Sequence, residues 1–111
     1  MKGTQIGELE EIILLTVGTL YDDAYGVAVM QNVEERTGRK LTISTVHSVL
    51  KRLEEKGYCE SRYDGATKER GGRRKHLFRV TVAGEKVLHE SREIRNQLWN
   101  AIPGIAFNRG E

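Results

Sequence analysis

Residues 42–81 read TISTVHSVLKRLEEKGYCESRYDGATKERGGRRKHLFRVT, and this stretch decides the fold. Its first part predicts a helix that begins after the N-cap Thr42 and stops at Gly57. Its apolar residues recur at helical spacing and form one inward stripe: Ile43, Val46, Leu50 and Leu53. Residues 58–63 and 76–81 are rich in aromatic and β-branched side chains and flank a glycine-containing tip, so they predict a β-hairpin.

The outward face of the helix carries small polar and basic side chains: Ser44, Thr45, His47, Ser48, Lys51 and Arg52. Small hydroxyl side chains near a helix N-terminus allow the backbone to approach a DNA groove closely and to contact bases or phosphates. Lys51 and Arg52 follow one turn later, where contacts to phosphate or guanine are expected. An ordinary surface helix would explain the same residues, so the helix alone does not establish DNA binding.

The tip of the hairpin is long, basic and rich in glycine. Residues 64–75 include five Lys or Arg, one Glu and three Gly, whereas a hairpin turn needs only about two to five residues. A long basic loop beside a helix of this kind is the pattern of a winged helix, in which the loop reaches DNA phosphates. The alternative is a surface loop with no ligand. We therefore expect contacts to DNA from the following tip residues: Lys68, Arg70, Gly72, Arg73, Arg74 and Lys75.

The distribution of charge agrees with this interpretation. The chain has 111 residues and a net charge of +2. Residues 1–35 carry one lysine against seven acids, a net charge of −6, whereas residues 36–75 carry twelve Lys or Arg against five acids, a net charge of +7. Such asymmetry is typical of a polyanion-binding face, although charged blocks are often only solvated surface.

Helices are also predicted on both sides of this stretch. Apolar residues recur at helical spacing from Ile6 to Leu20 and predict a first helix that is buried on most sides. Asp22 or Asp23 is the expected cap of a second helix, which ends at Gly38. The inward positions of this second helix are expected at Val27, Met30 and Val33.

A fourth helix completes the predicted chain. Thr81 is its expected cap, and Pro103 and Gly104 end it. The predicted fold is mainly α with a small β-hairpin: a winged helix-turn-helix over residues 1–81, a C-terminal dimerisation helix over 82–103 and a tail over 104–111.

Five segments follow one another along the chain in a definite order and spacing: ELEEIILLTVGTL at 8–20, AYG at 24–26, STVHSVLKRLEEKGY at 44–58, GGRRKHLFRVT at 71–81 and the TxxG pattern at 81–84. In this order and spacing, the chain resembles the PadR family of bacterial transcriptional regulators in its short, single-domain form. The resemblance implies a homodimer, joined through the C-terminal helix with help from the first helix, that represses by binding palindromic promoter DNA. It places residues 44–52 on the recognition helix and 65–75 on the wing, with Tyr25 and Gly26 at a phosphate-facing helix start.

The chain departs from the family pattern at the entry to the recognition helix. The family commonly has a Pro-Gly pair where this chain has Ile43 and Ser44, and a Tyr where His47 stands. His47 is therefore either a DNA contact or simply a core or surface histidine.

The fourth helix carries the pattern expected of a dimer element. Val87, Ile94 and Ala101 repeat every seven residues, as do Gly84, Ser91 and Leu98. This seam is short, so we expect the first helix to add to it. The predicted interface consists of Ile6, Leu9, Val87, Ser91, Ile94, Leu98, Trp99 and Ile102. A two-fold axis would place paired recognition helices about 34 Å apart, one turn of DNA.

Trp99 suggests a further hypothesis. Near a two-fold axis, it and its symmetry mate could form the walls of a flat pocket for a small planar aromatic effector. The alternative is that Trp99 only fills the interface.

The sequence favours neither catalysis nor a metal or other cofactor. Cys59 lacks a partner at metal-binding spacing, and His47, His76 and His89 form no ligand pattern. The longest apolar run is only residues 12–15, so we expect no membrane span. With a single cysteine and no signal-peptide pattern, a cytoplasmic location is expected. The main rival to DNA binding is a winged-helix module that binds another protein.

Overall fold

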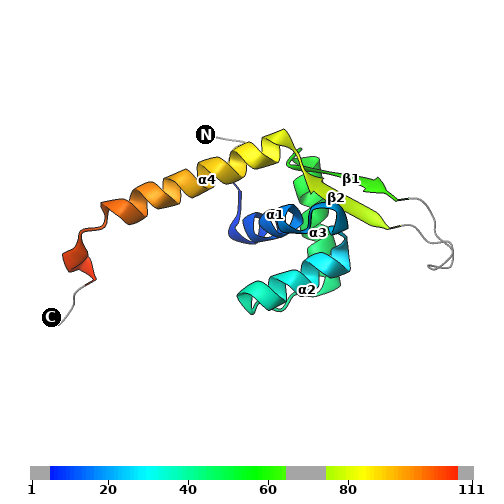
Figure 1. Cartoon of the computed structure of the whole chain (residues 1–111), viewed down its shortest axis with the longest axis horizontal. Helices are drawn as coiled ribbons and strands as arrows, with labels where there is room; N and C mark the ends of the chain where they lie inside the picture. Colours follow the sequence, from blue (N-terminus) through cyan, green and yellow to red (C-terminus); the bar gives the residue numbers. More distant parts are fainter. Residues whose placement is uncertain (1–5, 65–74, 108–111) are drawn as a thin grey trace.

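The computed structural model describes residues 6–64 and 75–107 (Figure 1). Within these ranges the chain is mainly helical, with one antiparallel hairpin and a long C-terminal helix, as predicted. The elements in chain order are α1 (Glu8–Leu20), η1 (Tyr21–Asp23), α2 (Gly26–Thr37), α3 (Ile43–Glu55), β1 (Cys59–Tyr63), β2 (His76–Val80), α4 (Val82–Ala101) and η3 (Gly104–Ala106).

Three helices and the hairpin enclose one apolar core. Helix α1 contacts α2, α3, β2 and α4, so it lies at the centre of the fold. Ala24 and Cys59 add to the fully buried core, but most of its side chains come from α1, α2 and α3: Ile13, Leu14, Val17, Val29, Val33, Val46, Val49, Leu50 and Leu53. The prediction that α1 is buried on most sides is thus confirmed, although its Leu15 remains half exposed.

Helix α3 and the hairpin form as the sequence predicts. The Thr42 hydroxyl accepts a hydrogen bond from the Thr45 amide at 3.1 Å, which caps the helix. Gly57 adopts a φ of +83°, a left-handed conformation that reverses the chain toward β1. Strands β1 and β2 then pair in register from Cys59 opposite Val80 to Tyr63 opposite His76.

The start of α2 differs from the prediction. Asp22 and Asp23 do not cap the helix, because they form the short turn η1 and the N-cap is Tyr25. The reason is a long-range contact: the Phe78 amide donates to the Ala24 carbonyl at 2.8 Å, which draws the chain before α2 alongside β2.

The inward positions of α2 also differ from the prediction in part. Val27 was expected to face inward but is 42% exposed, and Val29 is fully buried instead. Val33 is buried and Met30 packs against the core, as predicted, and Gly38 ends the helix with a φ of +76°.

Helix α4 packs its buried residues on the body only in its first half, and Arg95 adds an ion pair of 3.0 Å to Glu11 of α1. Thr81 caps it by accepting from the Gly84 amide at 3.0 Å, and Gly84 packs tightly against the backbone of Tyr58. Val87 is only 3% exposed and belongs to the core of the single chain. Beyond Ser91 every described residue is exposed, and Figure 1 shows the helix projecting away from the body.

The close approach at Gly84 yields a prediction about stability. In Gly84→Ala the new methyl group would collide with the carbonyl oxygen of Tyr58 and crowd Val80. Because a backbone group cannot move aside easily, we expect a loss of about 2 kcal/mol or more in the free energy of unfolding. Urea unfolding at fixed protein concentration measures it. Gly104→Ala is the matched control, since nothing lies within 4 Å of the added methyl group. Equal stability of the two variants would contradict the prediction.

Candidate nucleic-acid interface

The exposed face of α3 carries most of the residues predicted to bind DNA. Ser44, His47, Ser48 and Lys51 are all exposed on this helix, and their spacing places them on one side of it. Thr45 differs, because it is half-buried and its hydroxyl lies 3.0 Å from that of Thr42, within the helix cap. The structure therefore gathers four predicted residues on one open surface, which we call the α3 face.

The start of α2 meets the base of the hairpin. The Lys75 ammonium lies 4.7 Å from the centre of the Tyr25 ring, a cation–π contact, and 3.9 Å from an Asp23 carboxylate oxygen. The isolated bridge between Tyr25 and Leu77 holds the two segments together. Tyr25 and Lys75, predicted separately from the sequence, are thus neighbours.

The two strands of the hairpin are bonded to each other as far as Asp64 and Lys75. The Asp64 amide donates to the Lys75 carbonyl at 2.8 Å, and the rings of Tyr63 and His76 stack with centroids 4.3 Å apart. These contacts fix the base from which the predicted wing extends. The remaining predicted tip residues lie outside the described part of the chain: Lys68, Arg70, Gly72, Arg73 and Arg74.

Arg52 makes a contact within the chain. Its Nε donates to a carboxylate oxygen of Glu10 at 2.9 Å, and the Lys56 ammonium donates to the same carboxylate at 2.9 Å and 3.0 Å. The Gly7 amide adds a fourth hydrogen bond at 2.9 Å. Arg52 therefore belongs to an ion-pair cluster that joins α1 to the end of α3, and it flanks the α3 face.

The Glu10 carboxylate is strongly held in its charged form. Its side chain is only 8% exposed, and burial by itself would raise the pKa. The hydrogen bonds from Gly7, Lys56 and Arg52 outweigh that effect and lower the pKa to about 2. This cluster was not predicted from the sequence, because the partners lie more than forty residues apart; an acid within a largely apolar helix was its only signal.

His47 rests against the first residue of α2. A methyl group added at Gly26 would come within 2.8 Å of His47 Cε1. The ring is thus packed on one side against α2 while the residue as a whole remains exposed. It belongs to the α3 face and is not part of the core.

The predicted dimer residues fall into two groups. Val87 is buried in the single chain, and Ile6 and Leu9 pack against its core. Ser91 is half-buried and donates to Glu11 at 3.0 Å. The exposed group lies further along α4 and at its end: Ile94 (58% exposed), Leu98 (66%), Trp99 (67%) and Ile102 (38%). Of the eight predicted residues, these four remain available to a partner, whereas Val87 does not.

Trp99 has an aromatic neighbour that was not predicted from the sequence. Residues 104–106 form the turn η3, and the Phe107 ring then packs against Trp99 with centroids 5.7 Å apart. The predicted tail thus folds back on α4 at this point.

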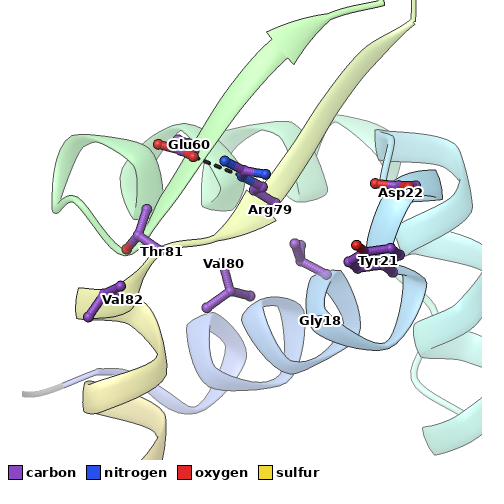
Figure 2. A pocket seen from close by; sticks show the side chains of 9 residues that line it. Gly18, Tyr21, Asp22, Glu60, Arg79, Val80, Thr81 and Val82 are labelled. Carbon is purple, nitrogen blue, oxygen red and sulfur yellow. Dashed lines mark hydrogen bonds and ion pairs between the residues drawn. The ribbon is translucent and has the colours of Figure 1, made fainter.

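A separate hollow of about 530 Å³ lies between α1, the hairpin and the start of α4 (Figure 2). Val17, Gly18 and Val80 give it an apolar lining, and Arg79 and Glu60 form an ion pair of 2.8 Å at its rim. From Val82 at this hollow to Trp99, α4 rises by roughly 25 Å. The hollow is therefore distinct from the predicted effector contact.

The described residues offer few groups for metal binding or for nucleophilic chemistry. Among the described residues, no three His, Cys, Asp or Glu side chains gather as a metal site would require. Burial, with smaller contributions from Glu54 and Glu60, raises the pKa of Cys59 to about 12, so its thiol is held neutral and unreactive. No helix in the described ranges is both long and apolar enough to cross a membrane.

Comparison with known proteins gives a consistent result. The sequence profile described as "Transcriptional regulator PadR-like family" matches residues 13–90, more than half of the chain. No curated protein matches the chain.

Several solved structures share the fold. A PadR-like transcription factor from Bacteroides fragilis has a TM-score of 0.71 at 21% identity, over 83% of this chain and 84% of that one. A PadR family regulator from Eggerthella lenta also has a TM-score of 0.71, at 22% identity over 92% and 83% of the two chains. A transcriptional regulator from Clostridium thermocellum is 28% identical, with a TM-score of 0.64 over 83% and 89%. These matches confirm the predicted winged-helix fold, and they are to regulators, not to enzymes.

The Glu10 cluster yields a prediction about pH. Because the pKa of Glu10 falls from 4.5 to about 2, its charge stabilises the fold above about pH 4.5, and this contribution disappears as the pH falls toward 2. Glu10→Gln should therefore lower the free energy of unfolding by about 2 kcal/mol at neutral pH, and the difference from wild type should shrink on acidification. Urea unfolding at neutral and at acidic pH measures both.

Glu8→Gln is the control for this experiment. Glu8 also pairs with an arginine, Arg39, at 3.3 Å, but its carboxylate is 70% exposed. Its loss should cost well under about 1 kcal/mol at any pH. If the effect of Glu10→Gln were the same at neutral and acidic pH, packing and not charge would explain the role of Glu10.

Proposed function

Because the chain belongs to the PadR-like family of transcriptional regulators, we propose that it binds a palindromic promoter site as a homodimer and represses transcription from it. The observation that carries this proposal is the α3 face, an open surface of hydroxyl, imidazole and ammonium groups. It lies beside the start of α2, and α2 in turn meets the base of a strongly basic hairpin.

The chemistry of these groups suits double-stranded DNA. Ser44 and Ser48 are small enough to let α3 approach the floor of a major groove, and their hydroxyls both donate and accept hydrogen bonds. Lys51 and the basic residues of the hairpin neutralise phosphates on either side of the groove. Most sequence readout would then come from α3, and most of the salt-dependent affinity from the wing.

The shape of α4 supports a homodimer. Its second half projects from the body (Figure 1) and exposes the apolar side chains of Ile94, Leu98 and Trp99. Exposed apolar side chains in such a row are typical of an interface. A two-fold pair of these helices would present two α3 faces to successive turns of DNA, about 34 Å apart. A dimer bound across a promoter would exclude other proteins from it and so repress transcription. Because DNA in a bacterial cell lies in the cytoplasm, the proposed function also implies a cytoplasmic location.

A winged-helix module that binds protein remains the alternative function. The two functions share one fold, and they differ in what the basic tip recognises. The net charge of +7 over residues 36–75 favours a polyanion.

A small planar aromatic effector is a second element of the proposal. Trp99 and Phe107 already form an exposed aromatic pair at the end of α4, and a two-fold axis nearby would double it. Trp99 is the only tryptophan in the chain, so its fluorescence reports directly on this position. Planar aromatic compounds should quench it and weaken DNA binding, and Trp99→Leu should abolish the effect on DNA. If neither fluorescence nor DNA binding changes, the effector has no place in the mechanism.

The proposed DNA contacts are tested by selecting bound sequences from a random pool of duplexes. A palindrome with half-sites about one helical turn apart is the expected result. On the selected DNA, replacing Arg70, Arg73 and Arg74 with Ala should weaken affinity for all sequences alike. It should also reduce the slope of log affinity against log salt by about one for each phosphate that the variant no longer neutralises.

Arg36→Ala is the matched control for these charge changes. Arg36 lies in the last turn of α2 and is bonded to Asn32 on the same helix at 2.8 Å. Its replacement should leave the salt slope unchanged. If the triple variant bound with the wild-type slope, the wing would have no role in binding; if no sequence were selected, the protein-binding alternative would be favoured.

A further inference from the structure

Gly26 is a glycine that its own backbone does not require. Among the described residues the glycines with a positive φ are Gly38 and Gly57, so Gly26 has a conformation that any residue can adopt. Gly26 is nonetheless buried, at the first position of α2. The reason for a glycine must therefore lie in what surrounds it.

The surroundings of Gly26 are two side chains of α3. A methyl group at this position would lie 2.8 Å from His47 Cε1, 3.0 Å from His47 Nε2 and 3.3 Å from Ile43 Cδ1. The first of these distances is shorter than van der Waals contact allows. The imidazole thus occupies the space that any larger residue at position 26 would fill.

The two neighbours differ from those of Gly84. At Gly84 the obstacle is a backbone carbonyl, which is fixed by the fold, whereas at Gly26 the obstacles are the far ends of side chains. Side-chain ends can rotate away at small cost. A methyl group at position 26 should therefore leave the fold intact and displace the His47 ring.

We propose that Gly26 is a positioning residue of the DNA-binding surface. Because it lacks a side chain, it leaves room for the His47 imidazole and fixes the position of the ring, and this position decides which DNA group the ring contacts. The inference rests on the proposed DNA-binding function. A ring that is packed on one side and open on the other loses little freedom on binding. His47 lies between Ser44, Ser48 and Lys51 on the α3 face, where its ring can donate to a hydrogen-bond acceptor of DNA.

The acceptor is either a phosphate oxygen or the edge of a base, and the two have different signatures. Removing a hydrogen bond to phosphate weakens binding to all sequences alike. Removing a hydrogen bond to a base relaxes sequence preference at one position of the half-site. Comparing His47→Ala with wild type on the selected DNA and on single-base variants of it distinguishes them.

A double-mutant cycle tests the positioning role in the full-length chain. Gly26→Ala should weaken binding to the selected DNA about tenfold, as expected for the removal of one hydrogen bond, with an almost unchanged unfolding midpoint. His47→Ala should weaken binding to a similar extent. The double variant should bind no worse than His47→Ala alone, because without the ring there is nothing left to displace. Gly18→Ala is the control, since its added methyl group would make only an ordinary contact of 3.8 Å with Val80.

A measurement without DNA tests whether Gly26 fixes the position of the His47 ring. The ring resonances of His47, followed by NMR in the free protein, should move in Gly26→Ala and stay in place in Gly18→Ala. Unmoved ring resonances, unchanged affinity of either single variant, or additive effects in the double variant would each overturn the positioning role. Failure of the wild-type chain to select any DNA would instead overturn the proposed function. The NMR measurement needs no DNA, so it would still test whether Gly26 fixes the position of the His47 ring.

Discussion

The carboxylate of Glu10 ties α3, the helix proposed to face DNA, to the body of the protein. It lies in the first turn of α1, where the helix dipole favours a negative charge, and it accepts from the Gly7 amide. Its other partners, Arg52 and Lys56, lie at the end of α3, where the dipole favours positive charge. Each charged group thus occupies the helix end that stabilises it, and the ion pairs join those two ends. Burial makes the pairing obligatory, because an unpaired charge there would be costly.

The neighbouring residue Glu11 makes a second connection from the same turn of α1. Its carboxylate accepts from the Ser91 hydroxyl and from Arg95, both at 3.0 Å, and so holds α4. Successive residues on a helix point in different directions, so one turn of α1 orients α3 on one side and α4 on another. In the proposed dimer, the separation of the two α3 faces depends on the angle between α4 and the body. Two adjacent carboxylates therefore set the geometry with which the proposed dimer would meet DNA.

The sequence predicted those parts of the structure that depend on local chemistry. Thr42 and Thr81 cap their helices, Gly38 and Gly57 reverse the chain, and the hairpin pairs where aromatic and β-branched residues predicted it. The errors come from long-range contacts. The α2 cap was misplaced because β2 draws Ala24 out of the helix. Likewise, a heptad pattern cannot show that Val87 belongs to the core of one chain while Ile94, one heptad later, is exposed.

The same limit applies to the candidate site. Periodicity alone separates the α3 face from the apolar stripe, so the sequence predicted that Ser44, His47, Ser48 and Lys51 are exposed on one side of α3. Periodicity does not show that Arg52 is bonded to Glu10 of α1 or that the His47 ring packs against Gly26. Helix α4 makes the point most clearly. Up to Ser91 one side of the helix packs on the body through Gly84 and Val87, whereas beyond Ser91 every described residue is exposed, although Arg95 still pairs with Glu11. Changes to the buried residues before that boundary should therefore act on the stability of each chain, and changes to Ile94, Leu98 or Trp99 on the proposed association of two chains, although one uninterrupted pattern runs through both halves.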